Sequence, residues 1–290
     1  MQTIFSEDLL QILLVYLDDI IRYSNSITDH FRWLQRVLQK LRDHGLKIEA
    51  AKCQFFQIHV KYLGHVVSSE GVATDPAKTE AIARWPTPKT LKGLRSFLGF
   101  TSYYRRIVPR FAQTAALLHQ LTAEISEKGK KKKSIITSEH RKGECKKAFD
   151  ELCTTLTTAP VLGYPDYSRP FIVETNAFGK GVGAVLSQKQ DGKLRVITYA
   201  SRTLCGAEWN IKNYSSMKLE LLALKCAVAE KIWEYLLGSE LLVYTNTQNP
   251  MGSIIATKPL EVLAMDFTQM EPATDGWENE LVLTDVFAKL

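Results

Sequence analysis

Two adjacent carboxylates interrupt an apolar run near the start of the chain, and this feature constrains the fold more than any other. Residues 14–21 read Leu-Val-Tyr-Leu-Asp-Asp-Ile-Ile, so β-forming side chains flank Asp18 and Asp19. The pattern predicts a hairpin whose turn carries both aspartates. Neighbouring carboxylates repel each other and resist desolvation, so folding alone gives little reason to keep them. A divalent cation such as Mg²⁺ gives a reason, because hard cations prefer oxygen ligands.

An Asp-Asp pair is also common in ordinary turns, so these two residues alone do not establish a metal site. The residues around and after the pair add a set of motifs in a fixed order. The motifs are Tyr16-Leu17-Asp18-Asp19, Lys52-Cys53-Gln54-Phe55, Tyr62-Leu63-Gly64-His65, Trp85-Pro86-x-Pro88, Leu94-Arg95-Ser96-Phe97-Leu98-Gly99, Tyr103-Tyr104-Arg105-Arg106 and Ala159-Pro160-Val161-Leu162. Together they resemble the Pol polyprotein of gypsy-type long-terminal-repeat (LTR) retrotransposons, and the resemblance covers nearly the whole chain.

Composition is compatible with this resemblance. The chain has 290 residues, 45% of them hydrophobic and 23% charged, which is enough for two or three small domains with their own cores. The net charge of +6 suits a polyanionic partner, although many basic proteins bind none. Five scattered cysteines without C-x-x-C spacing predict neither a disulfide framework nor a zinc site, and favour a reducing compartment. The apolar stretch 9–17 is too short to span a membrane, and no signal-peptide layout is visible, so we expect an intracellular protein without a membrane partner.

The resemblance implies that residues 1–72 are part of a reverse transcriptase palm. Asp18 and Asp19 would then be catalytic metal ligands for Mg²⁺ or Mn²⁺. The family's third aspartate lies on an earlier strand. Before Asp18 the sequence offers only Glu7 and Asp8, which we expect to belong to the last turns of a helix.

The resemblance also implies a surface that contacts nucleic acid, spread over a hairpin near Tyr62 and a helical thumb at 73–125. The candidate nucleic-acid-binding residues are Tyr16, Tyr62, Gly64, His65, Arg95, Tyr104, Arg105 and Arg106. Basic side chains interleaved with tyrosines suit contacts to a phosphate backbone, but a solvated helix face would have the same composition. Lys52 is either the lysine that assists the pyrophosphate leaving group in polymerases or an ordinary surface lysine. Gly64 and Gly71 suit turns in any case.

Local signals predict the boundaries of several elements. Thr28 or Asp29 can cap a helix that stops at His44-Gly45, and Asp75-Pro76 and Thr90 begin two more helices. Residues 126–165, with the run Lys130 to Lys133, are predicted to form a connection or linker. The region 166–250 then shows three strands, a helix over about 216–237 and a fourth strand at 241–245. This order resembles the ribonuclease H fold.

Ribonuclease H uses metal ions held by a cluster of carboxylates. By resemblance Glu220 matches the carboxylate on the helix, but Asn176 and Asn246 stand where the family has aspartates. An amide offers an oxygen but no charge, so metal binding should be crippled. Glu174 faces the same side of the strand as Asn176 but lies about 6.6 Å further back. Residues 251–290 resemble the start of an integrase core, whose first metal ligand would be Asp266.

These observations predict a multidomain α+β and α/β protein. It would comprise a partial reverse transcriptase palm, a helical thumb, a ribonuclease H-like mixed sheet with a helix, and an integrase-core stub, from a polyprotein that is truncated and internally deleted. Its class would be RNA-directed DNA polymerase and RNA–DNA hybrid ribonuclease, catalytically impaired in isolation. The partners would be an RNA–DNA hybrid or a template-primer, with other Pol chains as further candidates. The alternatives are a non-catalytic nucleic-acid-binding protein and a relic without function.

Overall fold

The computed structural model divides into two compact units, residues 1–63 and 64–290. The structure describes residues 3–8, 13–24, 26–128, 136, 143–178, 181–204, 208, 216–245, 263–269 and 279–285. Among these residues no helix is both long and apolar enough to cross a membrane. Cys53, Cys145, Cys153 and Cys226 are free thiols.

The first unit contains the predicted hairpin, which is confirmed. Strands β1 (Leu13–Tyr16) and β2 (Asp19–Arg22) pair antiparallel. They are followed by the helix α1 (Ile27–Asp43), a 3₁₀ turn, η1 (Ala50–Lys52), and the strand β3 (His59–Tyr62). The small core is formed by Phe5, Leu13, Val37 and Leu41.

Two sequence predictions for this unit were wrong. The cap of α1 is Ser26, whose hydroxyl accepts a 3.1 Å hydrogen bond from the Asp29 amide, rather than Thr28 or Asp29. Residues 3–8 form turns and not the end of a helix. In this turn the Asp8 carboxylate is buried between Arg36 and Lys40 of α1, at 2.9 and 2.6 Å, so a tertiary contact that local sequence does not show fixes it against the helix.

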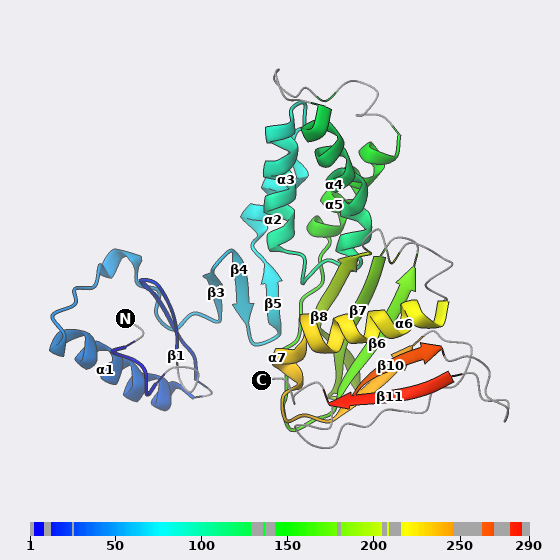
Figure 1. The fold of residues 1–290 in the computed structure, drawn as a ribbon. Coiled ribbons are helices and arrows are strands. Elements are labelled where there is room, and N and C mark those ends of the chain that lie inside the picture. Colours follow the sequence, from blue (N-terminus) through cyan, green and yellow to red (C-terminus); the bar gives the residue numbers. More distant parts are fainter. Residues whose placement is uncertain are drawn as a thin grey trace. The chain divides into compact units, whose positions relative to one another are not determined.

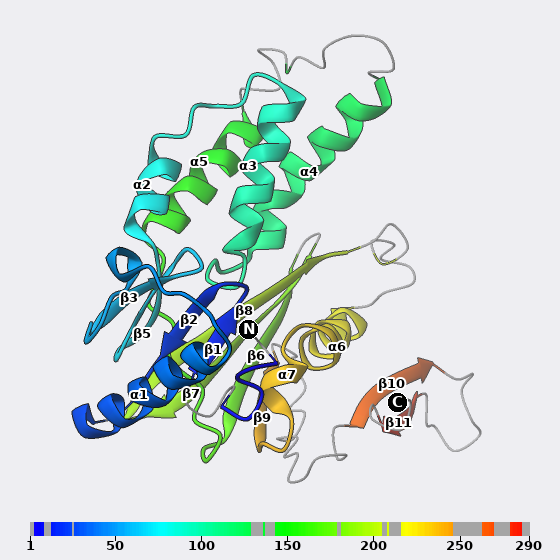
Figure 2. The same ribbon diagram turned by 90° about the vertical axis from the view of Figure 1, so that its left-hand side faces the viewer.

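The second unit begins with a hairpin and a helical bundle. The hairpin pairs β4 (His65–Ser68) with β5 (Gly71–Thr74). The bundle consists of α2 (Pro76–Ala83), α3 (Leu91–Tyr103), α4 (Phe111–Lys128) and α5 (Glu144–Thr157). Figure 2 shows α3, α4 and α5 running alongside one another.

The predicted caps of α2 and α3 are confirmed. The Asp75 carboxylate accepts a bond from the Ala77 amide at 3.1 Å, and the Thr90 hydroxyl accepts one from the Gly93 amide at 3.1 Å. The apolar faces of the bundle helices meet in one core that includes Ile82, Leu94, Phe97, Leu118 and Leu152. Helix α5 was not predicted, since its first residues were taken for part of the lysine-rich linker. Lys130 to Lys133 lie outside the described residues.

The ribonuclease H-like region forms a four-stranded mixed sheet, as predicted. The strands are β6 (Phe171–Phe178), β7 (Gly181–Gln190), β8 (Lys193–Thr203) and β9 (Leu241–Thr245), in the order β8-β7-β6-β9. Strand β9 pairs parallel to β6, and the other pairs are antiparallel.

The predicted long helix is interrupted. Helix α6 (Ser216–Lys225) continues into a π-helical segment, η2 (Cys226–Lys231), and ends in the short α7 (Trp233–Leu236). Figure 1 shows α6 lying across one face of the sheet, with the bundle standing over one end of the strands. Further along the chain, β10 (Leu263–Gln269) and β11 (Asn279–Asp285) pair antiparallel.

The outer edge of β8 is occupied by the segment that joins α3 to α4. The Tyr199 amide donates to the Arg106 carbonyl oxygen at 2.8 Å, and the Ala112 amide donates to the Ser201 hydroxyl at 3.0 Å. An exposed strand edge invites pairing with other chains, so this contact protects the edge and ties the bundle to the sheet.

Candidate metal sites and nucleic-acid interface

The two aspartates lie at a tight and strained turn. Tyr16 pairs with Asp19, which leaves Leu17 and Asp18 as the two turn residues. Leu17 has φ of 53°, a left-handed conformation that costs an L-residue about 1–2 kcal/mol. Its side chain is 73% exposed, so burial does not compensate for this strain. The strained turn presents both carboxylates to solvent, where a cation could reach them.

Tyr16 and Tyr62, two of the predicted nucleic-acid-binding residues, belong to the first unit together with this turn. Burial raises the pKa of the Tyr62 phenol, and the charges of Asp19 and Tyr16 raise it further. Tyr62 therefore lies close enough to the turn for its charges to act on it.

Lys52 forms an exposed ion pair with Glu49 at 2.6 Å, which favours the interpretation of this residue as an ordinary surface lysine.

Gly64, His65 and Tyr104 come together in the second unit. The Tyr104 hydroxyl donates a 2.9 Å hydrogen bond to the Gly64 carbonyl oxygen, and Gly64 has φ of 73°. The His65 ring lies 5.5 Å from the Tyr103 ring and 5.4 Å from the Tyr104 ring. Burial lowers the pKa of His65 and raises that of Tyr104 to about 12. Tyr104 is only 2% exposed, so its ring holds the hairpin against the bundle.

The three predicted arginines each bind another part of the second unit. Arg95 donates to the Ser126 hydroxyl at 2.7 Å, and Arg105 donates to the Ser201 carbonyl oxygen at 2.8 Å. Arg106 pairs with Glu234 at 2.6 Å, with its side chain still 54% exposed. The sequence did not predict Ser201 and Glu234 as partners of these arginines, because nothing local marks a partner on a distant element.

The ribonuclease-like carboxylate is buried. Glu220 is 5% exposed, and its Oε1 accepts a 3.1 Å hydrogen bond from the Ala177 amide. Its Oε2 is buried without a partner in the described structure, as is the Thr175 hydroxyl. Burial raises the pKa of Glu220, and the Ala177 hydrogen bond opposes this shift.

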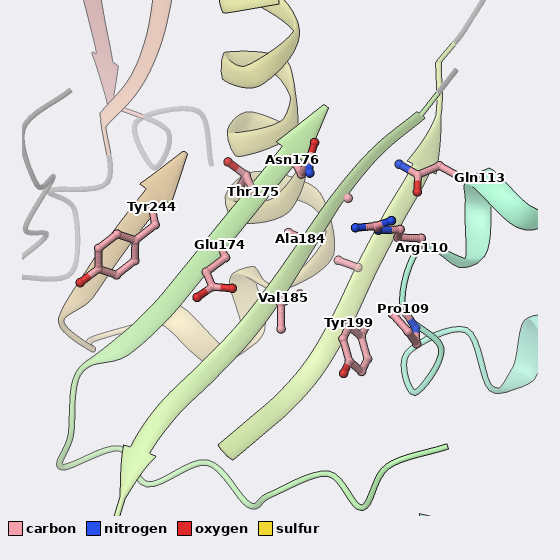
Figure 3. Close-up of a pocket in the computed structure, with 12 residues that line it drawn as sticks. Pro109, Arg110, Gln113, Glu174, Thr175, Asn176, Ala184, Val185, Tyr199 and Tyr244 are labelled. Carbon is pink, nitrogen blue, oxygen red and sulfur yellow. The ribbon is translucent and has the colours of Figure 1, made fainter. Parts of the chain in front are cut away.

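Asn176 and Glu174 both line a pocket of about 440 Å³ between the sheet and the start of α4. The two side chains share a strand face, as their spacing predicts. Figure 3 shows Arg110 reaching from the bundle side over the strands, with Tyr199 and Tyr244 on the flanks. A guanidinium disfavours a metal cation here, since the pocket holds a single carboxylate.

Two candidates lie wholly or partly outside the described residues. Asn246 lies outside the described residues. Asp266 belongs to β10, where it pairs with Val282, but the structure describes only its backbone. Among the described residues no three His, Cys, Asp or Glu side chains gather where they could hold a metal ion.

Two family models match the chain. Residues 1–67 match the reverse transcriptase (RNA-dependent DNA polymerase) model, and residues 142–243 match the model of an RNase H-like domain found in reverse transcriptase. The matches end at residue 243, so the integrase reading of residues 251–290 stays a prediction.

Solved structures share the fold over most of the chain. A foamy viral protease-reverse transcriptase in complex with double-stranded DNA covers 86% of this chain and 41% of its own, with a TM-score of 0.72 and 23% identity. Another such structure covers 85% of this chain and 50% of its own, with a TM-score of 0.69 and 25% identity. The family models therefore identify part of a reverse transcriptase domain and an RNase H-like domain in this chain, and the solved structures share its fold.

More narrowly, the chain belongs with the Pol polyproteins of gypsy-type LTR retrotransposons. The Drosophila melanogaster Pol polyprotein from transposon 297 is 37% identical over 235 residues, which are 81% of this chain and 20% of that protein. The Pol polyprotein from transposon gypsy of the same organism is 36% identical over 261 residues, 88% of this chain and 24% of that protein. The chain thus spans about a fifth to a quarter of the length of these relatives.

Proposed function

We propose that the chain binds an RNA–DNA hybrid or a template-primer as part of an RNA-directed DNA polymerase and hybrid ribonuclease, and that alone it catalyses neither reaction. Both reactions use divalent cations held by carboxylates. The observation that carries the proposal is the donor set, because no trio of metal-ligating side chains gathers among the described residues.

The polymerase side of the proposal rests on the aspartate turn. Asp18 and Asp19 are exposed and could share a cation, whereas Asp8, which the sequence already places on another element, is engaged by Arg36 and Lys40. Two carboxylates without a third ligand should hold Mg²⁺ weakly. A third carboxylate supplied by another Pol chain would complete this site.

The ribonuclease side rests on Glu220 and Asn176. The unpartnered Oε2 of Glu220 could accept a metal, but its other oxygen is bonded to the Ala177 amide. Asn176 adds no charge. A single buried carboxylate does not match the needs of a two-metal site, so no catalytic step is assigned to it.

The nucleic-acid partner is supported by charge and by the relatives. The chain carries a net charge of +6, and the side chain of Arg106 stays half exposed beside the sheet. The foamy viral relatives were solved in complex with double-stranded DNA or an RNA/DNA hybrid. A positive surface that binds phosphates should lose affinity steeply as salt rises.

A primer-extension assay tests the proposal. The purified chain is given a template-primer with Mg²⁺ or Mn²⁺, and we expect binding without synthesis. Asp18→Asn is compared with Asp191→Asn, a matched change in an exposed turn. Synthesis that Asp18→Asn abolishes and Asp191→Asn preserves would contradict the proposal that the chain alone is inactive. Failure to bind the template-primer would contradict the proposal that the chain binds nucleic acid.

A further inference from the structure

Residues 162–164 connect the β4–β5 hairpin to the sheet. On one side, Val72 and Leu162 exchange two backbone hydrogen bonds, both 2.9 Å long. The Tyr164 hydroxyl donates to the Ser68 carbonyl oxygen at 2.8 Å, across 96 residues of sequence. These contacts hold both strands of the hairpin.

The same residues are bonded to the sheet on their other side. The Gly163 amide donates to the Val196 carbonyl oxygen at 2.7 Å, and the Gln190 side chain donates to the Tyr164 carbonyl oxygen at 2.7 Å. Arg195 of β8 also reaches the hairpin directly, donating to the Glu70 carbonyl oxygen at 3.2 Å.

The packing at this junction is very close. A Cβ atom on Gly71 would lie 2.0 Å from the Leu162 carbonyl oxygen, and one on Gly163 would lie 3.2 Å from the Arg195 Cβ. Closely packed backbones cannot slide past each other without losing hydrogen bonds.

We propose that residues 162–164 couple the β4–β5 hairpin to the ribonuclease H-like sheet, so that the two open and move as one body. The position of the hairpin would then be fixed relative to the sheet and not only relative to the helical bundle. The coupling goes beyond the proposed function and does not depend on it, since it concerns the protein without nucleic acid.

Amide hydrogen exchange of the full chain tests this coupling. Tyr164→Phe removes one hydroxyl and keeps the ring, and we expect exchange over residues 68–74 to rise about fivefold, the usual effect of one hydrogen bond. Tyr167→Phe is the matched control, since Tyr167 is 58% exposed and packs its ring on Phe171. Equal exchange in both variants would overturn the proposal.

A second comparison separates coupling from a merely local contact. Val173 is fully buried in the sheet core, so Val173→Ala should speed exchange in β6 and, through the coupling, in the hairpin. In a background of Tyr164→Phe and Arg195→Gln, the sheet should respond as before and the hairpin less strongly, because only the backbone bonds of Leu162 and Gly163 remain. If Val173→Ala leaves the exchange rate of the hairpin unchanged in the otherwise native chain, the coupling is overturned. The Tyr164→Phe comparison remains a test even if Val173→Ala does not fold.

Discussion

The carboxylate of Glu220 accepts a 3.1 Å hydrogen bond from the Ala177 amide, while its second oxygen is buried without a partner among the described residues. Burial raises the pKa of Glu220, and the hydrogen bond lowers it by less. Folding therefore stabilises the neutral form of Glu220 relative to its charged form, compared with the unfolded chain.

This raised pKa predicts a pH dependence of stability. The folded-state pKa lies above the ordinary value of 4.5, so the stabilising contribution is complete below that pH and is lost as pH rises through the folded pKa. Glu220→Gln should remove this loss. Urea unfolding between about pH 4 and pH 8 measures it, with Glu174→Gln on the opposite strand face as the control. A wild-type profile in Glu220→Gln would contradict the prediction.

Gly71→Ala should destabilise the second unit. Gly71 has φ of 143°, and an added Cβ would meet the Leu162 backbone oxygen at 2.0 Å. Backbone must shift, so we expect a loss of about 1–3 kcal/mol in the free energy of unfolding. Gly99→Ala is the control, because Gly99 lies in α3 with open space around it, and the change should stabilise by up to about 1 kcal/mol. Similar effects of the two changes would show that the junction is loose.

The Arg106–Glu234 pair allows a separation of structural and binding roles. Both side chains are about half exposed, so breaking the pair from either side should cost no more than about 1 kcal/mol of stability. If Arg106 also contacts phosphate, Arg106→Gln should weaken hybrid binding and reduce the salt slope by about 1. Glu234→Gln should leave both unchanged. Fluorescence anisotropy over a salt series measures this, and equal affinity of the two variants would remove Arg106 from the interface.

Because the backbone of Leu17 is strained, we expect the turn to tolerate glycine at this position. Glycine adopts the left-handed conformation without the Cβ penalty, so Leu17→Gly should be neutral or stabilise by up to about 1 kcal/mol. Leu38→Gly, at a less exposed site inside α1 (40% against 73% for Leu17), should cost about 1 kcal/mol or more. Thermal unfolding distinguishes the two, and a large loss in Leu17→Gly would mean that the turn is not strained.

Elements marked by local chemistry could be predicted from the sequence. The caps at Asp75 and Thr90 and the hairpin around Asp18 follow from short-range patterns of capping and alternation. Helix α5 was missed because a lysine run and polar residues precede it, which is the composition of a linker. Its helix depends on packing Phe149 and Leu152 into the bundle core.

The contacts that organise the site depend on residues far apart in sequence. Arg105 and Arg106 were predicted to contact nucleic acid. No sequence pattern indicates that Arg105 binds Ser201 or that Arg106 binds Glu234. Gly71 could be recognised as a turn residue, whereas its approach to Leu162 follows only from how the hairpin lies against residues 162–164. Tertiary register of this kind is not encoded in local periodicity.

An end-labelled RNA–DNA hybrid, followed for both retention and cleavage in Mg²⁺ and in Mn²⁺, shows whether the chain binds nucleic acid without cleaving it. We expect salt-sensitive retention without cleavage, because the described residues bring together no complete set of metal ligands. Cleavage that disappears in Glu220→Gln would contradict it, since the depleted site would then still assemble its metals.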